Sequence, residues 1–333
     1  MGPLWIALLR VATGSDGSGA STFFSRDLYR LALANKVALT YLSRVRSDGL
    51  SEKLFQCHSR RLNALMNVLV DVVEALDEHG FRYVVFKTLR PFREEVADID
   101  ILCLGDDEEC EELVHAVQSR VYRLMERGLY CATFEDPRYR FVTEVMIDVY
   151  REISAGPVIY LDKRLLRSHV VLTEVGSTGV KVLDPVAETL VTIGHSIVKE
   201  RRMILADYLM VLHYLESMSS TQVRKLIELA RSAKLVCASR WFLTLALHMY
   251  SAVHGCILKR LVDLVNMLGG AIDLDTNVFE NEPPFQCSRE VLARVLIEKL
   301  RDPLFRSSIA NLIPWLFKGE SMHRLTNLLV HRL

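Results

Sequence analysis

The middle of the chain differs in its side-chain pattern from the long segments on either side. Residues 81–87 and 98–104 form short runs rich in aromatic and β-branched side chains, which is typical of strands. Before them, apolar side chains recur at helical spacing over residues 25–47 and 51–79. After residue 184 almost every segment has helical spacing. This order predicts an α+β fold, in which a small mixed-sheet core is flanked by an N-terminal helical segment and a large all-helical C-terminal domain.

The same pattern divides the chain into three expected parts. Residues 1–55 form a helical lead-in with a flexible Gly/Ser stretch, residues 56–184 form the core, and residues 185–333 form a helical domain. Asp184 is a good helix N-cap because Pro185 follows it at the first helical position. Further strands are expected at 129–134, 138–151, 169–175 and 180–183, and helices at 107–128, 185–200, 203–218, 220–233, 237–254, 256–269, 288–300, 303–317 and 320–331.

The composition argues against several classes of protein. The 41 Lys and Arg residues are balanced by 41 Asp and Glu residues, so the chain has no overall basic field that would attract nucleic acid. Seven cysteines form no CxxC pair, which favours buried reduced thiols over a zinc site or a disulfide framework. Arg10 interrupts the first apolar run, and no run is long enough to span a membrane. We therefore expect a cytoplasmic protein without a membrane partner.

Three aspartates carry the chemistry that the sequence predicts. Asp98 and Asp100 lie two residues apart in an expected strand, so their side chains point to the same face. Two neighbouring carboxylates repel unless a cation lies between them, and Mg²⁺ prefers oxygen ligands. Asp148 lies in another expected strand among apolar neighbours, where an unpaired carboxylate is costly. The three residues predict a shared Mg²⁺ or Mn²⁺ site. The alternative is structural, with Asp98 opening a strand, Asp100 in solvent and Asp148 paired with Arg151.

The order of these parts resembles the polymerase-beta-like nucleotidyltransferase superfamily. In that family a Gly-Ser turn follows the first strand, a DxD pair lies on the next strand, and a third carboxylate lies on a later strand. Here Lys87-Thr88 stands where the family has Gly-Ser, and Asp98-Ile-Asp100 and Asp148 follow. The resemblance covers residues 81–215, and it is greatest to a poorly characterised group with a later His and Asp, similar to His195 and Asp207.

The resemblance implies a site for a nucleoside triphosphate, with ATP expected. Asp98, Asp100 and Asp148 would be the catalytic and metal-binding residues. Positive charge near the missing glycine turn, and on the helix that follows, would hold the phosphates. The candidate nucleotide-binding residues are Lys87, Thr88, Arg90, Arg93, His195 and Lys199. Taken without the family, His195 is more often a structural residue of its helix, and Asp207 is expected to cap or to form a local salt bridge.

The predicted function is metal-dependent transfer of a nucleoside monophosphate from the triphosphate to an acceptor hydroxyl. The acceptor stays open between a protein, a tRNA and a small molecule. The alternatives are a non-catalytic nucleotide-binding module and a toxin–antitoxin-type regulator acting on a protein or tRNA partner. The apolar C-terminal helices could form a homodimer interface.

Residues 14–22 resemble the phosphate loop of thymidylate-kinase-like proteins, but Ala20 replaces its lysine, which favours a flexible turn instead.

Overall fold

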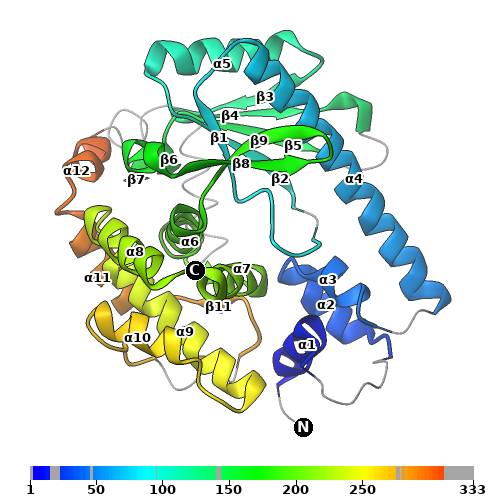
Figure 1. Cartoon of the computed structure of the whole chain (residues 1–333), viewed down its shortest axis with the longest axis vertical. Coiled ribbons are helices and arrows are strands. Elements are labelled where there is room, and N and C mark those ends of the chain that lie inside the picture. The colour runs from blue at the N-terminus through cyan, green and yellow to red at the C-terminus, as the bar shows by residue number, and fades with distance from the viewer. Residues whose placement is uncertain are drawn as a thin grey trace.

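The computed structural model describes residues 3–15, 23–45, 48–94, 96–139, 144–274, 278–279 and 281–310. Its centre is a seven-stranded sheet in the order β3-β4-β5-β2-β1-β9-β8 (Figure 1). β2 pairs with β5 and β1 with β9 in parallel, and the other neighbours are antiparallel, so the sheet is mixed as predicted. The strands are β1 (Tyr83–Phe86), β2 (Asp98–Cys103), β3 (Arg123–Arg127), β4 (Cys131–Glu135), β5 (Met146–Tyr150), β8 (Val170–Val175) and β9 (Thr178–Leu183).

Helices account for most of the remaining described chain, and the α+β class is confirmed. Two short antiparallel pairs join β6 (Ile153–Ala155) to β7 (Val158–Leu161) and β10 (Arg202–Met203) to β11 (Phe285–Gln286). The helices are α1 (Leu4–Thr13), α2 (Arg26–Ala34), α3 (Ala38–Leu42), α4 (Gly49–Glu78), α5 (Asp107–Ser119), α6 (Pro185–Gly194), α7 (Leu205–Ser217), α8 (Ser220–Ser232), α9 (Val236–His254), α10 (Lys259–Met267), α11 (Arg289–Lys299) and α12 (Pro303–Ala310), with the π-helical turn η3 (His195–Lys199) directly after α6.

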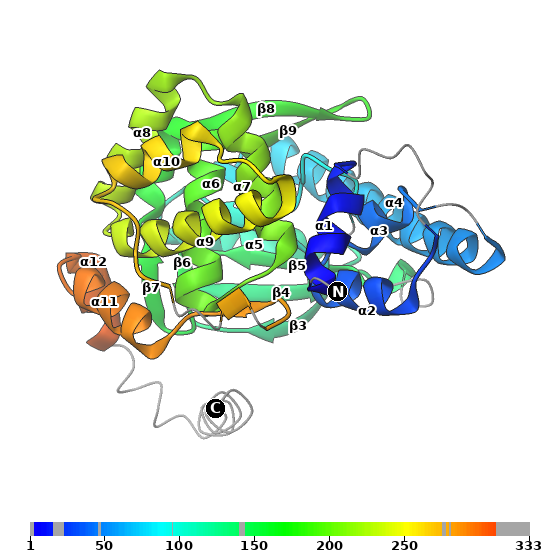
Figure 2. The ribbon, with the colours of Figure 1, turned by 90° about the horizontal axis from the view of Figure 1, so that it is seen from below.

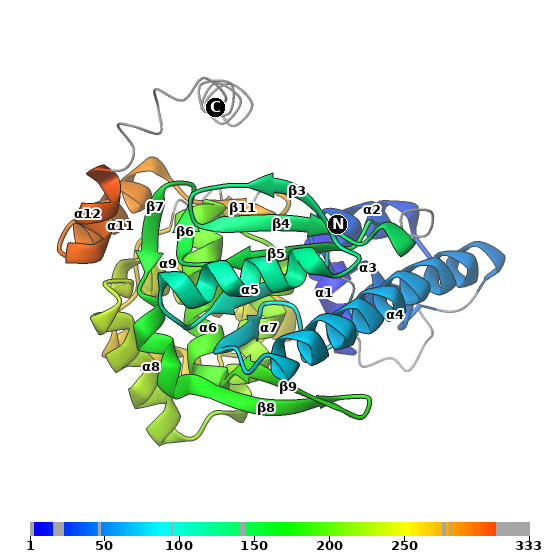
Figure 3. The same cartoon turned by 90° about the horizontal axis from the view of Figure 1, so that it is seen from above.

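The two faces of the sheet are covered by different parts of the chain. α4 and α5 lie across one face (Figure 3), where they bury Ile99 and Ile101 of β2 in a shared apolar cluster. Leu102 belongs to a second cluster on the opposite face, together with the C-terminal helices (Figure 2). Because side chains alternate along a strand, Asp98 and Asp100 share the face of Leu102. The aspartates therefore point toward the helical half of the molecule.

The N-terminal helices pack against the C-terminal helices as well as beside the sheet. Trp5 of α1 lies edge to face with Phe285, at 5.7 Å between ring centroids. Asn35, between α2 and α3, is fully buried and donates a hydrogen bond to the Pro283 carbonyl at 3.0 Å. Its own side-chain oxygen accepts from the Leu205 amide at 3.2 Å. The predicted three-part division stays a prediction, and one apolar cluster runs through residues of all three parts.

Several expected boundaries were wrong. The expected helix at 25–47 breaks at Lys36, and the helix expected at 51–79 begins earlier, at Gly49, where Asp48 caps α4. The helix expected at 107–128 ends at Ser119, because residues 123–127 pair with β4 as an exposed edge strand despite their helix-forming side chains. The strand expected at 138–151 was wrong at its start, since residues 138 and 139 belong to the 3₁₀ turn Pro137–Tyr139; residues 140–143 lie outside the described residues.

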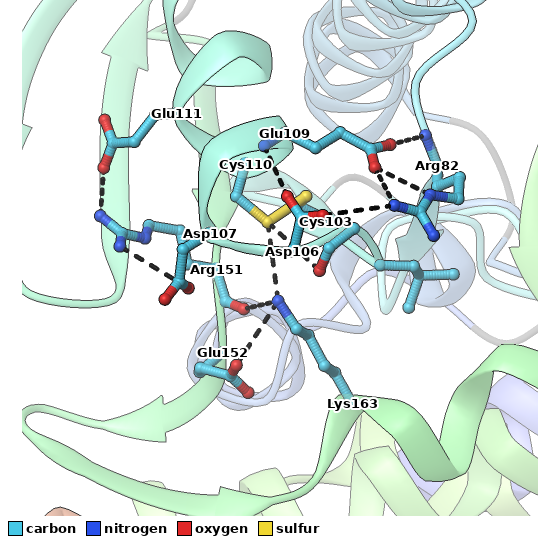
Figure 4. The surroundings of a disulfide bond; sticks show 12 residues. Arg82, Cys103, Asp106, Asp107, Glu109, Cys110, Glu111, Arg151, Glu152 and Lys163 are labelled. Carbon is cyan, nitrogen blue, oxygen red and sulfur yellow. Dashed lines mark hydrogen bonds and ion pairs between the residues drawn. A yellow bond between two sulfur atoms is a disulfide. The ribbon is translucent and has the colours of Figure 1, made fainter.

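The cysteine prediction was also wrong for one pair. Cys103 at the end of β2 and Cys110 in α5 are joined by a disulfide (Figure 4). Both are buried, and the Lys163 ammonium lies 3.6 Å from the Cys110 sulfur. This pairing could not be predicted from the cysteine spacing, because the six positions between the two cysteines combine a turn with the start of a helix. The other five cysteines are free thiols.

Some expectations at both ends of the chain lie outside the described residues. Near the C-terminus these are the helix at 320–331, the part of the 303–317 helix after Ala310, and the apolar helices expected to form a homodimer interface beyond that residue. Near the N-terminus this is most of the Gly/Ser stretch at 14–22. In the part of the chain that the structure describes, every helix is too short or too polar to span a lipid bilayer.

Candidate functional site

The three predicted aspartates meet on one face of two adjacent strands. Asp100 of β2 stands opposite Asp148 of β5 in the parallel register, and Asp98 stands opposite Met146. Asp100 is only 6% exposed. The structural alternative, in which Asp100 faces solvent and Asp148 pairs with Arg151, does not hold, since Arg151 contacts Asp107 and Glu111 instead. The sheet thus brings together two carboxylates from one strand and one from its neighbour.

All three aspartates line one cavity of about 180 Å³. Its walls come from the sheet, from α7 and η3, and from the turn between α2 and α3. His195 and Asp207 also line it. So do five cationic side chains: Lys36, Lys87, Arg90, Lys199 and Arg202. The cavity therefore combines a carboxylate cluster with a ring of positive charge, which is the arrangement that a metal–phosphate ligand requires.

Asp148 is held by two hydroxyl groups of neighbouring residues. Thr133 on β4, which is opposite Asp148 in the register, donates its hydroxyl to Asp148 Oδ1 at 2.6 Å. The Tyr150 hydroxyl donates to Oδ2 at 3.2 Å. Lys199 Nζ lies 3.4 Å from that same hydroxyl oxygen. Both oxygens of Asp148 thus accept a hydrogen bond from a hydroxyl group. The Tyr150 hydroxyl lies between the Lys199 ammonium and the Asp148 carboxylate.

Lys87 occupies the position of the glycine in the family motif and adopts a glycine-like backbone conformation. Its φ angle is 56°, in the left-handed region that favours glycine. The Lys87 ammonium lies 3.0 Å from Asp100 Oδ2 and 3.4 Å from His195 Nδ1. Its amide donates to the buried carboxylate of Glu188 at 2.6 Å. The turn after β1 is therefore kept without glycine, and the side chain at that position neutralises Asp100.

Thr88 supports the strand rather than the cavity. Its hydroxyl is buried, accepts a hydrogen bond from the Asp100 amide at 2.9 Å and donates to the Phe86 carbonyl at 3.2 Å. It does not line the cavity. Arg93 points elsewhere too, with Nη2 at 3.3 Å from the Ser59 hydroxyl and its guanidinium over the Phe55 ring of α4. Of the predicted phosphate-binding residues, Lys87, Arg90, His195 and Lys199 line the cavity, and Thr88 and Arg93 do not.

Arg90 is a buried cation with spare donors. Its side chain is 7% exposed, and Nη2 lies 4.0 Å from Asp207 Oδ1. Nε and Nη1 are buried and have no hydrogen-bond partner among the described residues. Asp207, which was expected only to cap or pair locally, is half-buried, accepts a hydrogen bond from the Ser196 hydroxyl at 2.7 Å and lines the cavity. Unsatisfied buried guanidinium donors are costly, so an anion placed against Arg90 would stabilise the site.

The pKa values of three carboxyl groups in the cavity are raised. Burial raises the pKa of Asp98 to about 6, and the charges of Asp100 and Asp148 add to that rise. Burial also raises the pKa of Asp148 and of Asp207. The pKa of His195 is lowered well below its usual value by burial and by the nearby lysine charges, so its ring is neutral at pH 7. A neutral imidazole whose Nδ1 accepts from Lys87 fits this environment.

The three aspartates have oxygen ligands of the kind that a hard divalent cation such as Mg²⁺ prefers. Three carboxylates on one face supply oxygen ligands, and their mutual repulsion, visible in the raised pKa of Asp98, would be relieved by a cation. As arranged in the structure, no three His, Cys, Asp or Glu side chains of the described ranges stand close enough to hold a metal ion. Lys87 takes one oxygen of Asp100, and hydroxyls take both oxygens of Asp148. The predicted Mg²⁺ or Mn²⁺ site stays a prediction.

Sequence reasoning missed several members of the site. Lys36 lines the cavity from a segment outside the predicted core. Glu188 lies beneath the Lys87 turn, and Thr133 orients Asp148. The only signal for Thr133 was its place in a strand next to that of Asp148, and none marked Lys36, which is brought in by tertiary packing.

The chain was compared with known protein families, curated proteins and solved structures. No family model and no curated protein matches the chain. Among solved structures, the chain is similar to an antigenic nucleotidyltransferase-like protein from Paracoccidioides brasiliensis, with 15% sequence identity and a TM-score of 0.36. The match covers 67% of this chain and 99% of that one.

Proposed function

We propose that this chain is a nucleotidyltransferase that moves a nucleoside monophosphate from a nucleoside triphosphate, expected to be ATP, to an acceptor hydroxyl. One observation carries the proposal. Asp98, Asp100 and Asp148 reach a single cavity from one face of paired strands, and that cavity is also lined by five cationic side chains. Arg90, which also lines the cavity, has two buried guanidinium donors without a hydrogen-bond partner among the described residues, and a bound phosphate would satisfy them.

The cations would hold the triphosphate. The spare Arg90 donors suit phosphate oxygens, because a guanidinium can bind two of them in one plane. Lys199 has no carboxylate partner among the described residues and stands near Tyr150, close to the carboxylate of Asp148. A divalent metal bound by Asp98, Asp100 and Asp148 would offset the charge that develops on the phosphates.

Asp148 is the best candidate for the base. Burial raises its pKa, which brings the carboxylate closer to the range in which it accepts a proton, and Thr133 and Tyr150 fix its orientation. The proton of the acceptor hydroxyl would pass to an oxygen of Asp148. The acceptor oxygen then forms its bond to the α-phosphorus, the bond from that phosphorus to the bridging oxygen breaks, and pyrophosphate leaves with that electron pair.

The proposal is tested by label transfer. The protein is incubated with each nucleoside triphosphate labelled at the α-phosphorus, with Mg²⁺ or Mn²⁺ and with host lysate, and the labelled macromolecule is identified. We expect transfer by the wild-type chain and none by the variant with both Asp98→Asn and Asp100→Asn. Arg93→Ala is the matched control, because Arg93 lies in the same loop but contacts α4. Unchanged transfer by the double variant would rule the site out.

A second candidate function is nucleotide binding without transfer. The Lys87–Asp100 ion pair favours it, since the ammonium takes the carboxylate that a metal would use. This candidate predicts that calorimetry detects binding of a triphosphate while no pyrophosphate is released. The acceptor class, including a toxin–antitoxin-type action on a protein or a tRNA, stays a prediction, as does a cytoplasmic location. The labelled product would identify the acceptor as protein, tRNA or small molecule.

A further inference from the structure

We propose that Lys36, in the turn between α2 and α3, binds the triphosphate, so that the N-terminal helices form one wall of the nucleotide site. This inference rests on the proposed function, because it assigns a new residue and a new segment to the same cavity. The segment was expected to be only a helical lead-in. Lys36 nevertheless lines the cavity that contains Asp98, Asp100 and Asp148.

The first support comes from backbone conformation. Four non-glycine residues of the described ranges have a positive φ, and two of them line this cavity. Lys36, at 54°, and Lys87, at 56°, line it, and Arg201, at 56°, lies between the lining residues Glu200 and Arg202. A positive φ costs a residue with a side chain about 1 kcal/mol, and such strained residues gather at functional sites. The concentration of strained cationic residues here is what a built anion site predicts.

The second support is the way the strained turn is held. Asn35 is fully buried and its side-chain amide donates to the carbonyls of Leu31 and Pro283, each at 3.0 Å. Its side-chain oxygen accepts from the Leu205 amide at 3.2 Å, and its backbone carbonyl accepts from the Ala206 amide at 3.2 Å. These bonds tie the turn to the start of α7, the helix that carries Asp207. Lys36 is thus fixed in place relative to the cavity although its own side chain is exposed.

The third support is the charge that remains available. Lys87 is paired with Asp100, Arg90 faces Asp207, and Arg202 Nη2 lies 3.3 Å from Glu200. The Lys36 ammonium forms no hydrogen bond or ion pair with any described residue. Its charge is near enough to lower the pKa of Asp98 and of His195. Lys36 and Lys199 are therefore the lysines of the cavity whose charge a triphosphate can take without breaking a carboxylate pair among the described residues.

The experiment separates the ammonium from the backbone. Lys36→Gly removes the charge and suits the left-handed conformation, whereas Lys36→Ala removes the charge and keeps the strain. Lys53→Ala, at an exposed lysine of α4 that does not line the cavity, is the control. Binding of inorganic triphosphate and of ATP, each with Mg²⁺, is measured by calorimetry on the full chain, and thermal unfolding is measured in parallel.

We expect Lys36→Gly to bind both probes roughly tenfold more weakly than the wild type, as for the loss of one charge-assisted contact. Its unfolding temperature should equal or exceed that of Lys36→Ala, and Lys53→Ala should bind as the wild type does. If the wild type binds both probes and Lys36→Gly binds them equally well, Lys36 is not a triphosphate ligand and the proposed function stands. If the wild type binds neither probe, the proposed function itself fails, and this inference fails with it.

Discussion

The ammonium of Lys87 lies 3.0 Å from the carboxylate of Asp100, and Lys87 holds the turn after β1 at a φ of 56°. One residue thus does two things at the position where the resembling family has glycine. Its backbone keeps the glycine conformation, and its side chain supplies the positive charge nearest to the aspartate pair. These two roles can be separated by substitution.

Lys87→Gly should be more stable than Lys87→Ala. Both variants leave the buried Asp100 carboxylate without its partner, which costs on the order of 3 kcal/mol. Alanine in addition keeps the left-handed backbone, at about 1 kcal/mol. Urea unfolding of the two variants and the wild type measures both terms. A Lys87→Ala protein as stable as Lys87→Gly would mean that the turn relaxes and that φ is not constrained at this position.

Thr133→Val should destabilise the protein by about 1–2 kcal/mol, because the buried Asp148 carboxylate loses its closest donor. The matched control is Thr178→Val, which removes the exposed hydrogen bond from Thr178 to Glu74 and should change stability by less than about 0.5 kcal/mol. Chemical denaturation of the two variants gives the comparison. Equal effects of the two substitutions would argue that Asp148 does not depend on Thr133.

The aspartate cluster was predictable because its evidence is local. Alternation along a strand places Asp98 and Asp100 on one face, and an acidic residue in an otherwise apolar strand marked Asp148. The α+β class and the mixed sheet were predictable because the side-chain pattern changes from helical spacing to strand-like runs at residue 81 and back to helical spacing after residue 184. Lys36 and Glu188 could not be found in this way, because their places in the site are set by packing between segments that are distant in the sequence.

The wrong element boundaries and the two residues wrongly assigned to the site also result from contacts between segments that are distant in the sequence. Residues 123–127 have helix-forming side chains, yet pairing with β4 makes them an edge strand. The helical pattern is interrupted at Lys36, next to the buried Asn35, whose side chain is hydrogen-bonded to Pro283 and Leu205 of distant segments. Thr88 and Arg93 were grouped with the phosphate loop by proximity in sequence, but their side chains turn to the strand and to α4.

Glu188 should make stability depend on pH. Burial raises its pKa from 4.5 to about 7, and the Lys87 amide bond offsets only part of that rise. A carboxyl group with a raised pKa in the folded state stabilises the fold at low pH, and this contribution is lost as the pH rises from 4.5 through 7. Relative to Glu188→Gln, the wild type should therefore lose about 2 kcal/mol of stability between pH 5 and pH 8. The free energy of unfolding of both proteins across that range is the measurement, and parallel curves would contradict the shift.

The Cys103–Cys110 disulfide predicts a thiol count and a modest stabilisation. With five cysteines free, five thiols should react in the unfolded, unreduced protein and all seven after reduction. Closing so short a loop should stabilise the fold by about 2 kcal/mol. The variant with both Cys103→Ser and Cys110→Ser, compared with the wild type by thiol titration and denaturation, tests this. Seven reactive thiols before reduction would show that the bond does not form.

The central claim is that Asp98, Asp100 and Asp148 act together on a metal-bound nucleotide. Its most direct test is calorimetry of ATP binding with Mn²⁺, comparing the wild type with Asp148→Asn and with the control Asp162→Asn, whose carboxylate pairs with Arg164 away from the cavity. We predict metal-dependent ATP binding by the wild type and by Asp162→Asn, and at least a roughly tenfold loss in Asp148→Asn, about 1.4 kcal/mol or more. ATP binding that is equally strong in Asp148→Asn, or that does not depend on Mn²⁺, would contradict it.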